Sequence, residues 1–361
     1  MEIKRNEKAT ADKIMFRLSG RTKGNCFLVL IWIICAFIDI YYGENYGGII
    51  YKFFVAAVFA VLATYSLLID LGKVKPIEKK REKWYAIITI IIVIAVAAVV
   101  FWNYSVKTNK YNINSNKIPE SFDGFRIVQV SDLHNAKFDK YNSSILAPIF
   151  HAEPDIIVIT GDMIDSRRTD VDVAISFVQK AVNIAPVYYV NGNHESRVPE
   201  EYEKLKEGLG KAGVTILENS SADITIDDET ITLVGINDPT FRMKLVDDTM
   251  KQNIAHQLMH VIPDNNNYKI LLAHRPEYFD VYAGNIDLVL SGHAHGGQFI
   301  IPFVGGVIAP GQGFMPEYYK DSYIKNGTEM IVSRGIGNSI FSFRINNKPE
   351  IIVAELTKIA E

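Results

Sequence analysis

The sequence predicts a layered α/β domain that follows an N-terminal membrane region built of helices. The chain up to about residue 104 carries long apolar runs, and the remainder has the mixed composition of a soluble domain. In that remainder, short β-branched runs alternate with segments of helical length, which is typical of an α/β domain. A chain of 361 residues is long enough to bury a sizeable core in one large domain or two ordinary ones.

The net charge and the cysteine content place few limits on the function and location of the protein. The net charge of −3 argues neither for nor against nucleic acid as a partner. Both cysteines, Cys26 and Cys35, lie in the first apolar run. From residue 105 onward the sequence therefore allows no disulfide and no thiolate metal site, although this fixes no cellular compartment.

Three apolar runs indicate helices that cross a membrane. The clearest, WYAIITIIIVIAVAAVVFWNY at 84–104, carries no charge and supplies the roughly 20 residues that a crossing helix needs. The runs at 26–42 and 49–69 contain Asp39 and Lys52, each near the connection GENYGG, where a charge can reach the interface. These two runs predict spanning helices joined by a tight turn, with a re-entrant or interfacial hairpin as the alternative.

Basic residues set the predicted orientation. Seven Lys and Arg residues lie within 1–25, and the connection GKVKPIEKKREKW before the third run is also strongly basic. Such an excess of Lys and Arg is typical of cytoplasmic segments. Three crossings then place everything after residue 104 outside the cytoplasm, which predicts a multi-pass protein of the cell membrane with an extracytoplasmic domain.

Beyond the membrane region, the polar, Asn-rich residues 105–120 predict a linker. Nearly continuous apolar runs predict strands buried on both faces, at 125–130, 155–160, 186–190, 268–273 and 286–290. Segments of helical length lie at 140–151, 169–184 and 199–212. A second sheet is predicted from the stretch 214–237 together with EMIVSR and PEIIVAEL. The expected organisation is a cytoplasmic segment at 1–25, a transmembrane region at 26–104, a linker at 105–120 and a domain at 121–361.

Each of the five apolar strands ends in side chains suited to metal binding. They are Asp132 and His134 in SDLH, Asp162 in GDMID, Asn193 and His194 in NGNHE, His274 in HRPE, and His293 and His295 in GHAHGG. Ligand sites of α/β sheets form at the carboxyl ends of strands, so these residues can converge although they are far apart in sequence. Carboxylate, imidazole and carboxamide groups without thiolate suit Mn, Fe, Zn or Co.

Taken one at a time, these motifs favour ordinary structural roles. Asp132 can cap a turn, a lone GD is more often a turn than a ligand, and GNH can simply end a strand. The histidines of GHAH could form a hydrogen-bonded pair or hold a structural metal. All five motifs in this order, each at the end of an apolar strand, are hard to explain as coincidence and indicate a metal centre.

These motifs resemble those of the calcineurin-like metallophosphoesterases, whose pattern is D-x-H, G-D, G-N-H-[DE], H and G-H-x-H. The resemblance covers roughly residues 121–356 and leaves out the three apolar runs. The sequence is especially similar to a membrane-anchored bacterial branch of this family. The stretches that carry this similarity are GHAHGGQ, FIIPFVGGVIAPGQG, VSRGIGNS and KPEIIVAEL. The fold that this resemblance implies is a four-layer α/β/β/α metallophosphoesterase sandwich.

The resemblance also implies two divalent metal ions per chain. One ion would take Asp132, His134 and His295, the other Asn193, His274 and His293, with Asp162 bridging them. His194 would be the general acid at the leaving group. Two such ions lower the pKa of a bridging water, which gives hydroxide near neutral pH for attack on phosphorus.

Three further residues have open roles. Glu195 either orients His194 or caps the following helix, and Asp165 either supports a ligand or is a helix N-cap. Arg334 could bind a phosphate oxygen or form a surface ion pair. In the related purple acid phosphatases a tyrosine bound to ferric iron occupies the position of Asp165, so no ferric-tyrosinate centre is expected here.

The predicted function is a membrane-anchored phosphoesterase acting on phosphodiester, phosphomonoester or pyrophosphate bonds of an envelope or lipid-linked substrate. The bilayer is then a partner, no nucleic acid is expected, and no obligate protein partner is inferred. A catalytically idle metal-binding sensor or scaffold is the alternative. A transporter component is disfavoured, because the apolar runs offer few polar groups for a substrate path.

Overall fold

The structure, a computed structural model, describes residues 19–360 except 43–45, 76, 78, 141, 242–246, 339–340 and 342. The chain forms two compact units, one over residues 1–101 with 139–141 and the other over 102–138 with 142–361. Most of the expected cytoplasmic segment 1–25 lies outside the described residues, and its location stays a prediction.

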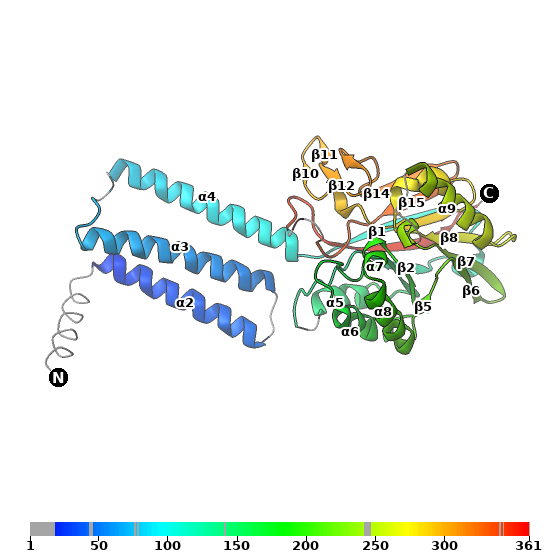
Figure 1. Cartoon of the computed structure of the whole chain (residues 1–361), viewed down its shortest axis with the longest axis horizontal. Coiled ribbons are helices and arrows are strands. Elements are labelled where there is room, and N and C mark those ends of the chain that lie inside the picture. Colours follow the sequence, from blue (N-terminus) through cyan, green and yellow to red (C-terminus); the bar gives the residue numbers. More distant parts are fainter. Residues whose placement is uncertain are drawn as a thin grey trace. The chain divides into compact units, whose positions relative to one another are not determined.

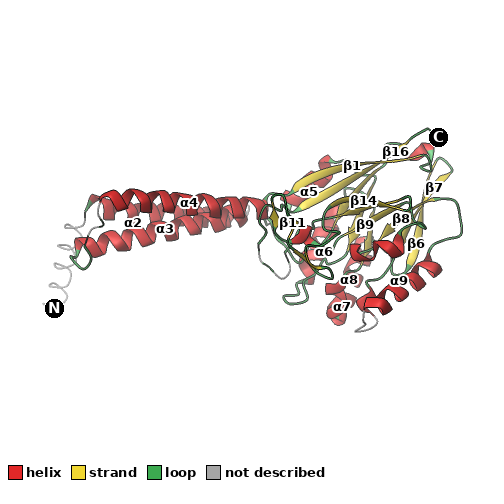
Figure 2. Ribbon diagram, turned by 90° about the horizontal axis from the view of Figure 1, so that it is seen from above, coloured by secondary structure: helices red, strands yellow, loops and turns green. Residues whose placement is uncertain are grey.

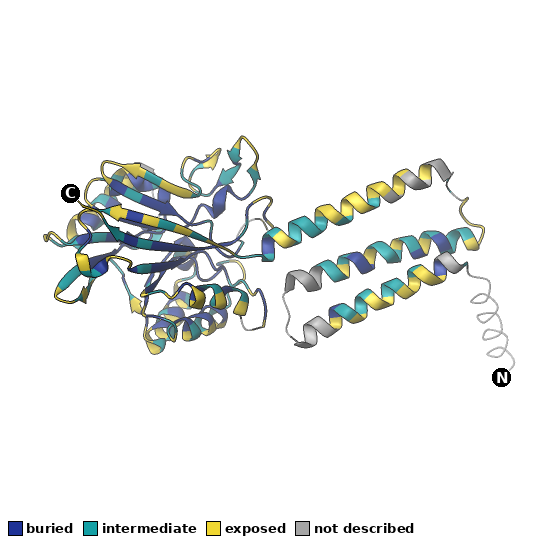
Figure 3. Cartoon of the chain, turned by 180° about the vertical axis from the view of Figure 1, so that it is seen from behind, coloured by how far each residue is buried: buried dark blue, intermediate teal, exposed yellow. Residues whose placement is uncertain are grey.

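The described residues of the first unit form three helices, the third of which ends in the second unit (Figure 1). They are α2 (Gly20–Tyr42), α3 (Tyr46–Asp70) and α4 (Lys79–Tyr104). The hydroxyl of Thr22 donates to Asp70 Oδ2 at 2.7 Å, which joins the beginning of α2 to the end of α3. The segments Tyr51–Asp70 and Ile87–Tyr104 are long and apolar enough to cross a membrane, whereas the apolar part of α2, Thr22–Phe37, is shorter. Exposed residues are frequent along α4 (Figure 3), and its apolar segment Ile87–Tyr104 is hardly buried.

Two six-stranded sheets form the centre of the second unit (Figure 2). The first has the order β1 (Lys107–Ser115), β16 (Glu350–Lys358), β2 (Arg126–Val130), β3 (Ile156–Thr160), β4 (Val187–Val190) and β5 (Thr215–Ile216). The second has the order β14 (Asp321–Lys325), β15 (Thr328–Val332), β9 (Leu288–Ser291), β8 (Tyr268–Leu272), β7 (Glu229–Gly235) and β6 (Ser220–Ile226). The strands β2 to β5 run parallel, as do β7, β8, β9 and β15.

Both faces of each sheet are covered, which gives the expected four layers. On β2, Val128 and Val130 pack toward helices, whereas Ile127 packs into the core between the sheets. The helices on the first sheet are α5 (Ser143–His151), α6 (Val171–Ala181) and α8 (Pro199–Ala212). Those on the second are α9 (Asp247–Val261) and α10 (Phe279–Tyr282). Burial on both faces explains why these strands read as continuous apolar runs.

Small elements complete the unit. A short helix, α7 (Asn193–Arg197), directly follows β4, and 3-10 turns lie at Glu120–Phe122, Pro239–Phe241, Pro276–Tyr278 and His295–Gly297. Beyond the last of these turns are two small hairpins, formed by β10 (Ile300–Ile301) with β11 (Gly305–Gly306) and by β12 (Ile308–Ala309) with β13 (Gly313–Phe314). These hairpins lie close to the metal-binding motif GHAHGG in sequence.

Two expectations about the organisation are wrong. The predicted linker 105–120 contains β1, which pairs in parallel with β16 along its whole length and buries Ile113 in the core between the sheets. Its many Asn residues lie on a sheet edge, where their side chains can be solvated or bonded, as Asn109 is to Glu350. The segment PEIIVAEL forms β16 of the first sheet rather than part of the second.

Candidate metal centre

The carboxyl ends of β2, β3 and β4 meet those of β8 and β9 at one edge of the sandwich. The backbone amide of His293 donates to Asp132 Oδ2 at 3.0 Å, which joins the end of β9 to the end of β2. Gly292 permits this close approach, because a Cβ atom there would lie 1.9 Å from Ser131 Oγ. All eight strand-end residues that the motifs single out are buried at this edge.

One group of ligand atoms comes from Asp132, His134 and His295, whose ligand atoms all lie within 4.8 Å of one another. His134 Nε2 and His295 Nε2 are 3.1 Å apart. Asp132 Oδ1 lies 3.7 Å from His134 Nε2 and 3.5 Å from His295 Nε2. Ligands held 2.0–2.2 Å from one ion are separated from each other by about 3–3.5 Å, so this spacing fits a shared cation.

A second group comes from Asp162, His274 and His293. His274 Nε2 lies 3.2 Å from Asp162 Oδ2, 3.1 Å from His293 Nδ1 and 3.3 Å from Asn193 Oδ1. His274 Nδ1 contacts the carbonyl of Thr160 at 2.7 Å, which orients the ring so that Nε2 faces the other donors. Asp162 Oδ2 is also 3.6 Å from His134 Nε2, so this carboxylate touches both groups.

Backbone strain marks the same residues. A left-handed backbone, rare for residues other than glycine, occurs at Asp132 (φ 53°), His134 (φ 47°), Asp162 (φ 52°), His293 (φ 65°) and His295 (φ 47°). Each such conformation costs roughly 1–3 kcal/mol and persists only where the surroundings enforce it, most often at functional sites. The backbone at the strand ends therefore adopts an energetically unfavourable left-handed conformation, and this conformation brings the side chains together.

The electrostatics of the cluster depend on burial and on the pairing of carboxylates with histidines. Burial alone would raise the pKa of Asp132, but His295 and His134 lower it to about 2. Burial would lower the pKa of His274, but Asp162 raises it to about 10. Burial lowers the pKa of His295 to about 3, with Asp132 only partly opposing. The ionised Asp162 is thus paired with a protonated His274, and a divalent cation bound at His274 Nε2 would take the place of that proton.

The donors fit divalent metal ions in a further respect. His134 Nδ1 is buried without a hydrogen-bond partner, and Asp165 Oδ2 lies 3.6 Å from it. Histidine ligands commonly donate their second ring N–H to a carboxylate, so Asp165 stands where such a partner belongs once Nε2 binds a metal. The N-cap alternative for Asp165 is wrong, because α6 begins after Asp170. Asp165 Oδ1 instead accepts the backbone amide of Arg167 at 2.7 Å.

His194 faces the cluster from α7. The backbone amide of Ser166 donates to His194 Nδ1 at 3.0 Å, so this nitrogen is an acceptor and the ring proton lies on Nε2. Burial lowers the pKa of His194 to about 4, with Asp162 opposing, which leaves the ring neutral near pH 7. The ligand atoms of His134, Asp162 and His194 lie within 4.8 Å of one another, so His194 stands beside both groups.

Glu195 binds backbone amides of two loops. Oε2 accepts the amides of Asp162 at 2.9 Å and Gly192 at 2.8 Å, and Oε1 accepts those of Met163 at 2.7 Å and Ile164 at 3.2 Å. Burial raises the pKa of Glu195 to about 7. The expected capping of the following helix is wrong, because α8 has Val198 as its N-cap and Glu195 instead caps its own helix, α7, through Gly192. The bonds to the loop after β3 were not anticipated. These bonds lock the loop that carries Asp162 against the turn that carries Asn193.

Arg334 forms an ion pair, one of its two expected roles, whereas a different arginine, Arg344, lies beside a candidate metal ligand. Arg334 lies 3.4 Å from Glu350 Oε2 and 3.5 Å from Asp321 Oδ1, in an ion pair mostly shielded from solvent. Arg344 is fully buried, and its Nη2 lies 3.3 Å from His295 Nδ1. Sequence reasoning missed Arg344, for which the only signal is a lone cation inside the apolar stretch FSFRI.

A second buried ionic group was also missed. Arg275 Nε donates to Asp238 Oδ2 at 2.6 Å, and its Nη1 donates to Glu277 Oε1 at 3.2 Å. Arg275 Nη1 also lies 3.4 Å from His293 Nε2, the ring nitrogen that does not face His274. The ionic group therefore contacts the His293 ring on the side that faces away from the cluster.

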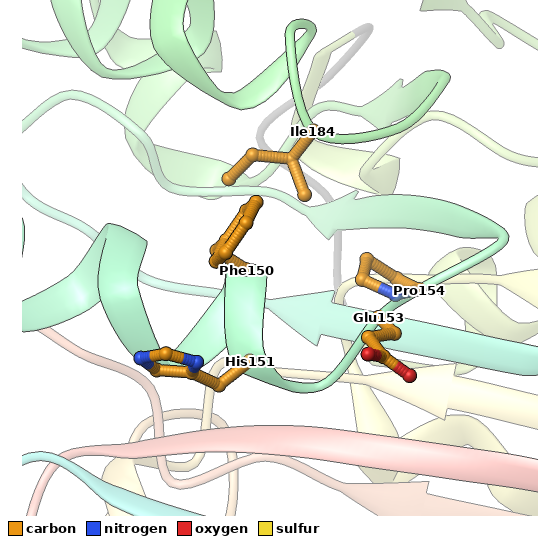
Figure 4. A pocket seen from close by; sticks show the side chains of 5 residues that line it. All are labelled: Phe150, His151, Glu153, Pro154 and Ile184. Atoms are coloured by element: carbon orange, nitrogen blue, oxygen red, sulfur yellow. The ribbon is translucent and has the colours of Figure 1, made fainter.

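A separate hollow of about 270 Å³ lies at the end of α5 (Figure 4). It is lined by Phe150, His151, Glu153, Pro154 and Ile184. It contains none of the strand-end residues, and its single histidine lacks the converging donors of the cluster. The chemistry therefore belongs to the edge where the two sheets meet.

We predict that Glu195→Gln destabilises the domain much more than Glu207→Gln does. The carboxamide introduced at position 195 would present N–H groups to backbone N–H donors, and each lost bond to a buried charged group costs about 1.5–3 kcal/mol, giving a loss of about 3–6 kcal/mol. Glu207 is exposed and paired with Lys211 at 2.6 Å, so its replacement should cost less than about 1 kcal/mol. Urea unfolding of the full chain in detergent measures both, and equal losses would contradict the assignment.

Comparisons with known proteins agree with this geometry. The sequence profile of the family described as Calcineurin-like phosphoesterase matches residues 125–297. The uncharacterized metallophosphoesterase YkuE of Bacillus subtilis is 30% identical over 261 residues, covering 70% of this chain and 86% of that protein. The phosphodiesterase YaeI of Escherichia coli is 27% identical, over 64% of this chain and 82% of its own.

A third relative, from Danio rerio, bears the name transmembrane protein with metallophosphoesterase domain. It is 29% identical over 65% of this chain and 54% of its own. The family match falls on the segment that holds every residue of the buried cluster, from Asp132 to His295. The chain belongs to the calcineurin-like phosphoesterase family and is a metal-dependent phosphoric ester hydrolase.

Proposed function

We propose that the buried cluster binds two divalent ions and that the chain uses both to hydrolyse phosphate esters. The ligands would be Asp132, His134 and His295 for one ion and Asn193, His274 and His293 for the other, with Asp162 shared. The observation that carries this proposal is the position of Asp162 Oδ2, 3.6 Å from His134 Nε2 and 3.2 Å from His274 Nε2. A carboxylate within reach of a donor from each group is the natural bridge between two ions.

When bound, the two ions supply an activated water and stabilise the attacking and leaving oxygens of an in-line displacement at phosphorus. The protein's own residues do the rest. Asp132 and Asp162 balance the positive charge, and Glu195 fixes the loop that presents Asp162. As the general acid, His194, which is neutral near pH 7 in the free protein, would take up a proton when the anionic ester binds beside it and would give that proton to the leaving oxygen. General acid catalysis of this kind typically contributes 10²- to 10⁴-fold in rate.

The proposal includes a membrane anchor and a substrate of the cell envelope, such as a lipid-linked phosphate or pyrophosphate. Two apolar helical segments, Tyr51–Asp70 and Ile87–Tyr104, and the transmembrane relative from Danio rerio support the anchor. The excess of Lys and Arg before the first and third apolar runs supports an extracytoplasmic catalytic domain. The donor set suits Mn, Fe, Zn or Co, and manganese is a convenient probe.

Asp162→Asn should abolish metal-dependent hydrolysis of bis(4-nitrophenyl) phosphate by the full chain. Even changes to residues behind the ligands cost 10- to 100-fold, so losing the shared carboxylate should lower kcat/KM more than about 100-fold. The protein is stripped with chelator and refilled with manganese, and Asp227→Asn, on the exposed β6–β7 turn, is the matched control. Hydrolysis that persists in Asp162→Asn would overturn the two-ion proposal. Two bound metals with no turnover of diester or monoester would favour the idle sensor or scaffold.

His194→Ala should slow esters with poor leaving groups far more than esters with good ones. Phenolate needs a proton as it departs, whereas 4-nitrophenolate hardly does, so the expected losses are about 10²- to 10³-fold for phenyl esters and under tenfold for 4-nitrophenyl esters. His256→Ala, on the exposed face of α9, serves as the control. Equal losses for both leaving groups would assign His194 to metal or substrate binding instead.

A further inference from the structure

Apolar side chains project into solvent from the two small hairpins that follow the metal-binding GHAH motif. We call these, with their neighbours near the C-terminus, the apolar loop surface: Ile301, Phe303, Val304, Phe314, Met315, Phe341, Phe343 and Ile345. Relative exposure reaches 110% for Phe303, 79% for Phe314 and 70% for Met315. Soluble proteins seldom expose so many large apolar side chains in a few loops unless those loops bind an apolar partner.

The members of this surface are tied into one structure. The backbone amide of Ile300 donates to the carbonyl of Ile345 at 3.1 Å, and that of Met315 donates to Val307 at 2.9 Å. The ring of Phe299 packs on Phe341 and Phe343, with centroids 5.3 Å and 5.5 Å away. The hairpins and the C-terminal residues therefore present their apolar side chains from a connected support.

A cavity of about 200 Å³ has lining residues from both the apolar loop surface and the metal centre. Its lining runs from His295 through Ile308, Ala309 and Pro310 to Phe341. Gly311, also in the lining, lies against Glu277 and near His293 Nε2. An apolar cavity of about 150 Å³ already accommodates a benzene molecule, so this one has room for several methylene groups. The cavity is thus lined both by a candidate ligand, His295, and by Phe341 of the apolar loop surface.

We propose that the cavity and the apolar loop surface hold the hydrocarbon chain of an amphiphilic phosphate ester whose phosphate reaches the metal centre. This inference rests on the proposed hydrolysis and names its substrate class. The chain's own apolar segment Ile87–Tyr104 supports a lipid source, because its last three residues belong to the same unit as the apolar loop surface. Asn103 Nδ2 donates to the carbonyl of Arg344, and the Arg344 amide donates back to Asn103 Oδ1 at 2.8 Å.

The test compares two diesters with the same leaving group, 4-nitrophenyl methyl phosphate and 4-nitrophenyl octyl phosphate, below the aggregation limit of the octyl ester. The full chain is held in lipid nanodiscs with manganese. Burial of two methylene groups is enough for about a tenfold gain in kcat/KM, so the octyl ester should be preferred by at least tenfold. The double variant Phe303→Ser with Phe314→Ser should lose that preference, and Phe150→Ser, at another exposed phenylalanine, on α5, should keep it.

Each other outcome has a distinct meaning. Equal kcat/KM for both esters in the natural sequence, or a preference that survives the double variant, would overturn the hydrocarbon site while leaving the hydrolase intact. Failure of both esters to turn over with metal would instead overturn the proposed function. An octyl phosphonate with a diazirine at its chain end gives a readout that is independent of turnover. Labelling should fall within residues 299–315 and 341–345, and labelling confined to α2, α3 or α4 would show only partition into the bilayer.

Discussion

Two buried carboxylates impose the constraint on which the rest of the domain depends. Asp132 and Asp162 are almost completely buried. Burying an ionised carboxylate costs several kcal/mol unless it is paired and hydrogen-bonded. Histidines from both sheets supply that pairing, and the backbone amides of His293 and His194 add hydrogen bonds to the two carboxylates. The sheets must therefore meet at the ends of their parallel strands, and the loops there must accept left-handed backbone at several ligand positions.

A short series of contacts connects the end of α4 to the candidate metal centre. Residues 102–138 and 142–361 belong to the second unit, and Asn103 bonds both backbone groups of Arg344. The Arg344 guanidinium in turn contacts His295 Nδ1 and binds the carbonyl of Arg334 at 2.6 Å. The residue through which the chain enters the catalytic unit is thus two contacts from a candidate ligand. A soluble domain that began after Asn103 would lose this support.

Much of the fold and most of the candidate site could be predicted, because each strand and the metal-binding residues after it form a short pattern of neighbouring residues in the sequence. Strands buried on both faces read as apolar runs, and the residues that follow them are a limited set of metal-binding types. The strand β1 escaped prediction because only Ile113 of its nine residues enters the core, and its partner β16 lies about 240 residues away in sequence. Arg344 and the bonds of Glu195 to the β3 loop depend on contacts between distant segments, which no local pattern encodes.

The most direct measurement is anomalous diffraction from crystals of the full chain loaded with manganese. Two peaks about 3.5–4 Å apart are expected, one beside Asp132, His134 and His295 and the other beside Asn193, His274 and His293, with Asp162 between them. The exposed pair His256 and His260, whose Nε2 atoms lie 3.1 Å apart on α9, provides an internal comparison for adventitious binding. A single peak at the strand ends, or manganese bound only at α9, would contradict the two-ion centre.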